Sequence, residues 1–395
     1  MIYLDNNATT RVDPMVLETM LPFLQGEYGN ASSGSTFAKP AKKALAKARV
    51  QVAALLGCQP EEILFTSGGT ESLNTALFSA TQLHTDRRHL VIGSTEHSAV
   101  LKPVAWLEKR QGYEVTRLPV DSLGRVDLDE LATAIRPGRT AAIALMWANN
   151  ETGVISPVPE AAALAEAHGI PFITDAVQAA GKILLSLEGL GIHSLAISGH
   201  KFHAPKGIGA LYVNRHFPFK PWMLGGAQEN NRRAGTENTA GIAGLGAAAE
   251  LALHHLRGHA GSGEGSGAES VRQLRDRFET EALRRIPGAH LNGDPVRRIP
   301  NTSSLRFDGV QAEGLILLLD QRGICVSAGS ACTAGSLDPS PVLTAMGLDA
   351  VAARSTVRFS FSRLTTADEV DQVLDGLEKS VVKFRSLFPA EGLNG

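Results

Sequence analysis

The feature that most constrains the fold is a repeated order of apolar run, polar loop and helix in the first half of the chain. The apolar runs span residues 63–66, 90–93, 141–147, 170–174 and 195–197. Short apolar runs of this kind predict buried strands, and helices between them predict parallel neighbours. The sequence therefore predicts an α/β fold with a mostly parallel sheet and helices on both faces.

The composition argues against several classes of protein. A chain of 395 residues can bury a large core and form about two domains. The net charge of −2 gives no electrostatic reason to bind nucleic acid or an anionic membrane. There is neither an apolar run of about 18 residues, as a transmembrane helix needs, nor a start typical of a signal peptide. The three cysteines are too few for a disulfide framework and fit a reducing cytoplasm.

Lys201 is a candidate nucleophile just after the strand at residues 195–197. It follows Ser198 and His200 in a polar loop, and a second apolar strand comes at residues 210–213. A lysine held between buried strands loses solvation, which lowers its pKa and lets the neutral amine attack a carbonyl. The alternative is a solvated loop lysine, since most loop lysines serve only solubility. The motifs elsewhere in the chain favour a Schiff-base lysine.

A glycine-rich turn, SGGTES, follows the strand at residues 63–66, and a helix is expected from Leu73. Free backbone N–H groups at such a helix start, here around Gly69, favour a phosphate, and Thr70 adds a hydroxyl. A tight turn with a capped helix is the alternative, because short Gly–Gly turns are common.

Polar side chains follow other predicted strands. His97, Asn150, Asp175 and Gln178 each come shortly after one. Ligands gather at the carboxyl ends of strands in open α/β sheets, although a single histidine is more often structural. The asparagine amide can hold a carboxylate or form a turn. An acid at the end of a buried strand needs a partner, and a protonated ring nitrogen, a lysine or a backbone group would serve.

Three of these features together meet the needs of pyridoxal 5′-phosphate (PLP). Lys201 suits the aldehyde, Asp175 suits the pyridinium nitrogen, and the glycine-rich helix start suits the phosphate. We therefore predict a PLP site. A metal site built on His200, His203 and a cysteine is the weaker alternative, and no metal is expected because no ligand spacing supports one.

The second half of the chain differs in composition. The stretch GHAGSGEGSG at residues 258–267 is typical of a flexible linker. Beyond it, helices alternate with few strands, which predicts a smaller α+β domain. We expect a large PLP-binding domain at residues 15–257 and a small domain made of residues 1–14 and 258–395.

Cys332 lies among small residues in the stretch VSAGSACTAG, which predicts a mobile or tightly turned loop. An exposed cysteine there can act as a nucleophile when its thiolate is available. Cys325, in an apolar run, and Cys58, at a predicted helix end, are interpreted as structural.

With these residues in view, the sequence resembles the NifS/IscS-type cysteine desulfurases, in the class V aminotransferase group of fold-type I PLP enzymes. The resemblance covers nearly the whole chain and is closer to the NifS/IscS group than to the SufS group. Its motifs are YLDNNATT, TSGGTES, TEHSAV, NNETG, DAVQAAGK, SGHKFHAPKGIGALY, RRAGTEN, GSACTAG and VRFSFSR.

The resemblance implies how the cofactor ring would be held. Lys201 would carry PLP as a Schiff base, and Asp175 would pair with the ring nitrogen. Gln178 would hydrogen-bond the phenolic oxygen. His97 would stack on the ring and assist proton transfer.

The resemblance also implies how the phosphate would be held and how the chain assembles. Thr70, Ser198 and His200 would bind the phosphate. Thr236 would reach the cofactor of the other subunit, which implies a homodimer.

For the reaction, the resemblance implies that Asn150 and Arg358 hold the carboxylate of L-cysteine. Cys332 would attack the substrate sulfur, giving L-alanine and a persulfide on itself. The sulfur would then pass to an acceptor, typically an iron–sulfur scaffold protein, with the persulfide as a transient cluster ligand.

Other proteins with this fold remain as alternatives. A selenocysteine lyase, a cystine C–S lyase or an aminotransferase needs no loop cysteine, so Cys332 favours desulfuration. A non-catalytic sulfur-relay subunit would be indicated by loss of Lys201 or His97, and both are present. The sequence leaves the sulfur acceptor open.

Overall fold

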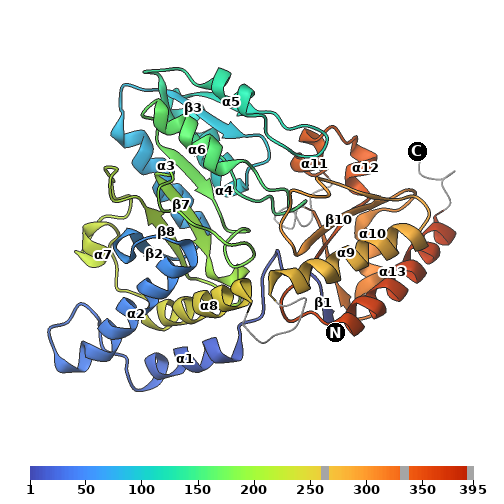
Figure 1. Cartoon of the computed structure of the whole chain (residues 1–395), viewed down its shortest axis with the longest axis horizontal. Coiled ribbons are helices and arrows are strands. Elements are labelled where there is room, and N and C mark those ends of the chain that lie inside the picture. Colours follow the sequence, from blue (N-terminus) through green and yellow to red (C-terminus); the bar gives the residue numbers. More distant parts are fainter. Residues whose placement is uncertain (259–266, 330–337, 389–395) are drawn as a thin grey trace.

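The computed structural model describes residues 1–258, 267–329 and 338–388. Figure 1 shows a larger α/β body beside a smaller body that carries the C-terminal helices and the N-terminal strand. Within the described residues, no helix is long and apolar enough to cross a membrane.

The larger body is built on a seven-stranded sheet with the order β2-β8-β7-β6-β5-β3-β4. Its strands are β2 (Ile63–Thr66), β3 (His89–Gly93), β4 (Glu114–Leu118), β5 (Thr140–Ala144), β6 (Phe172–Asp175), β7 (Ser194–Ser198) and β8 (Gly209–Val213). The strands from β7 to β4 pair in parallel, and β8 runs antiparallel to both β7 and β2. The predicted mostly parallel sheet is confirmed.

Helices cover both faces of this sheet because its buried strands are apolar on both sides. In β7, Leu195 and Ile197 join the core on one face, while Ala196 joins the core on the other. The first face packs against α2 (Lys39–Leu56), α6 (Val158–Ala167) and α8 (Thr239–Arg257). The second packs against α3 (Gly69–Leu83) and α4 (Ser98–Gln111). The remaining helices of this body are α1 (Pro14–Gln25), α5 (Leu128–Ala134) and α7 (Gln228–Asn231).

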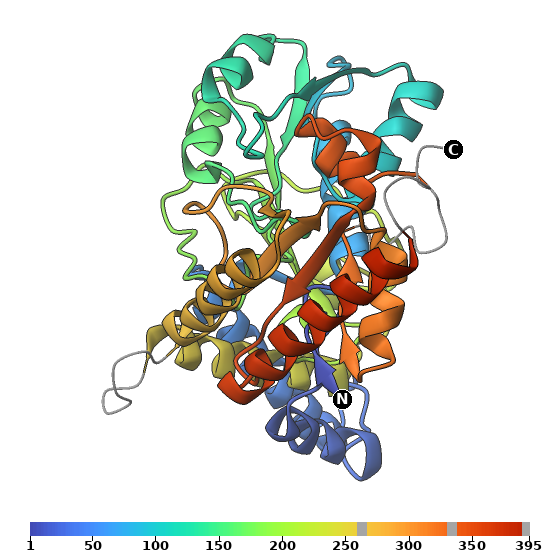
Figure 2. The same ribbon diagram turned by 90° about the vertical axis from the view of Figure 1, so that its right-hand side faces the viewer.

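The smaller body has its own sheet, with the order β12-β13-β10-β9. The strands are β9 (Ala289–Leu291), β10 (Thr302–Phe307), β12 (Ser327–Ala328) and β13 (Thr356–Ser360). Beside it, β1 (Ile2–Tyr3) pairs in parallel with β11 (Ile324–Cys325). Figure 2 shows α9 (Ala268–Arg285) and α13 (Ala367–Leu387) side by side on this body. The other helices are α10 (Ala312–Asp320), α11 (Pro341–Ala345) and α12 (Ala350–Arg354).

One boundary that matters for the site was predicted wrongly. The helix expected from Leu73 is α3, and it begins at Gly69. Gly68 has φ +153°, a conformation that glycine adopts readily, and this lets the chain leave β2 and enter the helix at once. The glycine-rich turn is therefore the first turn of the helix itself.

Candidate active site

A cavity of about 480 Å³ lies between the two bodies. The parallel strands β6 and β7 reach it with their carboxyl ends, and β13 reaches it from the small sheet. The predicted site residues that line it are Gly69, Thr70, His97, Asn150, Asp175, Gln178, Ser198, His200, Lys201 and Arg358. Residues far apart in the sequence thus meet in one place, as open α/β sheets favour.

One end of the cavity suits an anion. The 15-residue helix α3 starts there, and its N-cap residue Gly68 offers no side-chain cap. Its first backbone N–H groups and the helix dipole therefore face the cavity, beside Thr70. A Cβ at Gly69 would lie 2.7 Å from Cγ2 of Val177, so a side chain at this position would require Val177 to shift.

His200 also lines the cavity, from the short 3-10 helix Gly199–Lys201. Its Nδ1 lies 3.2 Å from Oγ1 of Thr9. Burial, and next the charge of Lys201, lower the pKa of this imidazole to about 4. His200 is therefore neutral at pH 7, and its Nε2 carries the N–H donor for a ligand in the tautomer whose Nδ1 accepts from the Thr9 hydroxyl.

Lys201 is half-buried, and its Nζ donates to the backbone oxygens of Asn7 (2.6 Å) and Ala8 (2.8 Å). Both carbonyls belong to the N-terminal segment that follows β1. The expected partial desolvation of this lysine is present, and its amine lines the cavity. In the sequence, Asn7 stood out only as part of the motif YLDNNATT, so this contact was not predicted.

Asp175 ends β6 and is 5% exposed. Its Oδ1 accepts the backbone N–H of Val177 at 2.9 Å. Burial raises the pKa of this carboxyl above its ordinary value, and the nearby charges of His97 and Lys201 partly oppose the rise. A cation placed in the cavity would stabilise the carboxylate, so the site suits a protonated ring nitrogen.

His97 caps the start of α4. Its Nδ1 accepts the backbone N–H of Ala99 at 3.1 Å, which fixes the orientation of the imidazole beside the cavity. The neighbouring residue Glu96 was missed at the sequence level. Its Oε1 accepts the backbone N–H of Met146 at 2.6 Å, and among the described residues its Oε2 has no hydrogen-bond partner. Burial raises the pKa of Glu96 well above its ordinary value, which favours the neutral form of this acid.

The small sheet contributes Arg358, which is 1% exposed. Its Nη2 pairs with Oδ1 of Asp5 at 2.8 Å, and its Nη1 donates to the backbone oxygen of Asn150 at 2.8 Å. The guanidinium therefore ties both bodies and the N-terminal segment together at the cavity wall. A guanidinium next to an asparagine is a good receptor for a carboxylate.

One predicted residue within the described ranges, Thr236, is not part of this cavity. Thr236 is exposed and lines a separate pocket with Ser67 and Arg233. This position is compatible with a role toward a second copy of the chain. Cys332 lies outside the described residues.

The residues present fit PLP on three observations. The uncapped start of α3 lies beside a glycine with no space for a Cβ. An amine lies in the same cavity at Lys201, and a buried acid in need of a cation lies there at Asp175. These supply an anion site, a carbonyl-reactive amine and a partner for the ring nitrogen. Within the described ranges, no group of histidine, cysteine and acidic residues could hold a metal ion.

Comparison with known proteins gives concordant matches. The family model described as aminotransferase class-V matches residues 2–373. A cysteine desulfurase of Gluconacetobacter diazotrophicus is 49% identical over 389 residues, which cover 98% of this chain and 95% of that protein. The cysteine desulfurase NifS of Azotobacter vinelandii is 46% identical, covering 100% of this chain and 96% of that protein. A solved NifS-like protein superposes with a TM-score of 0.88 at 35% identity, covering 97% of this chain and 99% of that one.

Proposed function

The chain belongs to the class-V aminotransferase family, as one of its PLP-dependent cysteine desulfurases, and on that premise we propose that Cys332 receives the sulfur of L-cysteine while L-alanine is released. The observation that best supports the cofactor roles is the meeting of Lys201, Asp175 and the start of α3 in one cavity. When bound, PLP supplies an electron sink conjugated to the substrate carbon.

The cofactor would be held along the whole length of the cavity. The start of α3, with Gly69 and Thr70, binds the phosphate together with Ser198 and His200. Asp175 keeps the ring nitrogen protonated, because a buried carboxylate and a cation stabilise each other. 

Three further residues act around the ring. Lys201 binds the aldehyde carbon through its amine. Gln178 donates to the phenolic oxygen, and His97 lies against the ring, held by its contact with Ala99.

We assign binding of the substrate carboxylate to Arg358 and Asn150, which together form one wall of the cavity. A carboxylate at this wall would complete the pairing of a guanidinium that already holds Asp5 and the Asn150 carbonyl. Binding the substrate by its carboxylate directs the cysteine side chain away from this wall.

The sulfur transfer is assigned to Cys332. Its thiolate attacks the substrate sulfur, an S–S bond forms, and the C–S bond breaks with its electron pair left on carbon. Protonation of that carbon gives alanine. The other thiols are poor alternatives, since burial raises the pKa of Cys58 to about 12 and also raises the pKa of Cys325.

Assembly and location belong to the same proposal. We propose a homodimer in which Thr236, exposed in the single chain, completes the phosphate site of the second subunit. An iron–sulfur scaffold protein is the proposed acceptor, with the Cys332 persulfide as a transient cluster ligand. The cytoplasm is the proposed location, because a reactive thiol needs reducing surroundings.

We also propose that residues 15–257 act as the large domain, and residues 1–14 with 258–395 as the small one. The apolar core of the small body is separate from those of the large sheet, which supports this division. Leu4 packs in the same core as Phe278 and Phe359, whereas the strands of the large sheet pack in other cores.

The assay that tests this function uses the purified full chain supplied with PLP and L-cysteine. We expect a visible band at roughly 390–420 nm, as a lysine-bound cofactor gives. With a reductant and excess cysteine we expect alanine and sulfide in equal amounts. Pyruvate and ammonia in place of alanine would indicate a C–S lyase, and the absence of a band would remove the cofactor roles.

A further inference from the structure

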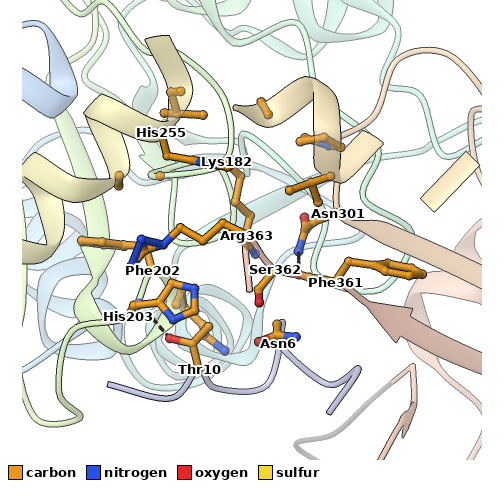
Figure 3. A pocket seen from close by; sticks show the side chains of 17 residues that line it. Asn6, Thr10, Lys182, Phe202, His203, His255, Asn301, Phe361, Ser362 and Arg363 are labelled. Carbon is orange, nitrogen blue, oxygen red and sulfur yellow. Dashed lines mark hydrogen bonds between the residues drawn. The ribbon is translucent and has the colours of Figure 1, made fainter. Parts of the chain in front are cut away.

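Lys182 is a buried lysine that none of the roles above uses. It is 8% exposed and directly follows Gly181, which has a positive φ. It lines a small cavity of about 40 Å³, and Figure 3 shows Lys182 together with His203 and Arg363 among the side chains that line it. No aspartate or glutamate of the described chain lines this cavity, so no carboxylate there balances a charge on Lys182.

The contacts of Lys182 match those of a neutral amine. Its Nζ donates to Oδ1 of Asn7 at 2.9 Å and to Oε1 of Gln178. Burial, followed by the charges of Lys201 and Arg358, lowers the pKa of Lys182 well below its ordinary value. A neutral amine has two N–H donors, and both have an acceptor here.

These contacts settle which way the Gln178 carboxamide faces. An amide can be turned so that its oxygen and nitrogen exchange places. The backbone oxygen of Asn7 can only accept, so the Gln178 atom that faces it is the nitrogen, and the oxygen of Gln178 faces the Lys182 donor. The nitrogen of Gln178 then donates one N–H to the backbone oxygen of Asn7 at 3.0 Å. Its second N–H remains for a ligand in the main cavity, which Gln178 also lines.

Asn7 joins this arrangement to the catalytic lysine. Its backbone oxygen accepts from Lys201 as well as from Gln178, and its Oδ1 accepts from Lys182 and from Nδ2 of Asn301 at 3.0 Å. Asn7 therefore contacts Lys201, Gln178 and Lys182. A substitution of Lys182 would affect the cavity residues through the two oxygens of Asn7.

We propose that Lys182 is a positioning residue that holds the Gln178 carboxamide with its N–H toward the phenolic oxygen of PLP. This inference rests on the proposed function, since it assigns the direction of a hydrogen bond within that site. In this role Lys182 touches neither substrate nor cofactor and acts through Gln178 and Asn7.

The test is a pH titration of the visible band in the holoenzyme and in three variants, Lys182→Met, Gln178→Leu and the double variant. A donor to the phenolic oxygen favours the deprotonated cofactor, so losing it raises the pH midpoint of the band. For Lys182→Met we expect a rise of about one pH unit, the scale of one hydrogen bond to a charged group. We expect Gln178→Leu to produce a shift in the same direction, and the double variant to shift no further than Gln178→Leu alone.

Two further variants serve as a control and as a substitute for Lys182→Met. Lys383→Met, at an exposed position on α13, is the matched control and is expected to leave the midpoint unchanged. If Lys182→Met fails to fold, Lys182→Gln keeps an uncharged N–H donor, and we expect its midpoint to lie between wild type and Gln178→Leu. Kinetics should show a lower kcat with little change in KM, because the carboxylate wall is untouched.

The outcomes separate this inference from the proposed function. A wild-type band with a Gln178→Leu shift and no shift in the Lys182 variants would overturn the positioning role and leave the function intact. Additive shifts in the double variant would show that Lys182 acts by its own route and would overturn it too. Absence of a band in the wild-type protein would instead contradict the proposed function.

Discussion

Replacing Lys201 with alanine is expected to remove the visible band of the protein and to lower turnover of L-cysteine by about 10⁵-fold, the scale of losing a covalent catalytic group. Lys201 supplies the amine that reaches the cavity from the 3-10 helix after β7. The variant also loses two hydrogen bonds to the segment at Asn7 and Ala8. The measurement is an absorption spectrum of protein supplied with PLP, followed by alanine release.

The matched control is Lys383→Ala, which removes an exposed lysine on α13 and should leave band and turnover unchanged. Because lost contacts at the N-terminal segment could weaken the fold, unfolding of both variants is measured without cofactor. A Lys201→Ala protein that folds, keeps the wild-type band and turns over cysteine would show that another amine binds the cofactor.

Replacing Asp175 with asparagine is expected to lower kcat by about 100- to 1,000-fold, the scale of removing one partner from a buried ion pair. Asparagine keeps the size of the side chain and loses the charge that we propose stabilises the protonated ring nitrogen. The change leaves the carboxylate wall at Arg358 untouched, so KM should change much less than kcat. Steady-state kinetics with L-cysteine measure both.

The same substitution should not destabilise the folded protein when no cofactor is bound. The pKa of Asp175 is raised in the folded chain by burial, so the folded state binds a proton more readily than the unfolded state. The free energy of unfolding therefore falls as the pH rises from the pKa of Asp175 in the unfolded chain through its pKa in the folded chain. Asparagine does not ionise, so the variant avoids this loss. Asp175→Asn should therefore be at least as stable as wild type at pH 7 without PLP. The control is Asp129→Asn at an exposed position of α5, expected to change neither property. Full activity in Asp175→Asn would contradict the assigned ring contact.

The parallel sheet could be predicted from sequence because it depends on local patterns. Each strand is a short apolar run, and β6 and β7 end in the polar residues Asp175 and Ser198, which line the cavity. Ligand sites at the carboxyl ends of such strands follow from topology alone. The composition of the turn at Gly69 indicated an anion site, although the start of the helix was placed too late.

Contacts between segments that are far apart in the sequence could not be predicted from these local patterns. Arg358 pairs with Asp5 across almost the whole chain, and only the family resemblance indicated that it belongs to the site. Asn7 belongs to a short polar stretch that indicates a turn, and its contacts with Lys182 and Lys201 arise only in the folded chain. A pattern of polar and apolar residues carries no information about such partners.

Buried ionisable groups were missed for a related reason. Lys182 and Glu96 stand next to motif residues in DAVQAAGK and TEHSAV, and composition treats a charged residue there as solvated. The fold instead buries both and shifts their pKa values toward the neutral forms. Desolvation depends on the neighbours that three-dimensional packing brings, so it could not be inferred from position in the sequence.

The measurement that tests the central claim most directly is the mass of the Cys332 peptide after reaction with L-cysteine. Holoenzyme is exposed to L-cysteine without reductant, its thiols are blocked by alkylation, and the digested peptides are weighed, with Cys332→Ala treated in parallel. We expect the Cys332 peptide to gain the mass of one sulfur atom and to lose it on reduction, while the Cys58 and Cys325 peptides stay unchanged and Cys332→Ala releases no alanine above background. An unmodified Cys332 peptide together with alanine release, or undiminished turnover in Cys332→Ala, would contradict the claim that this residue takes the sulfur.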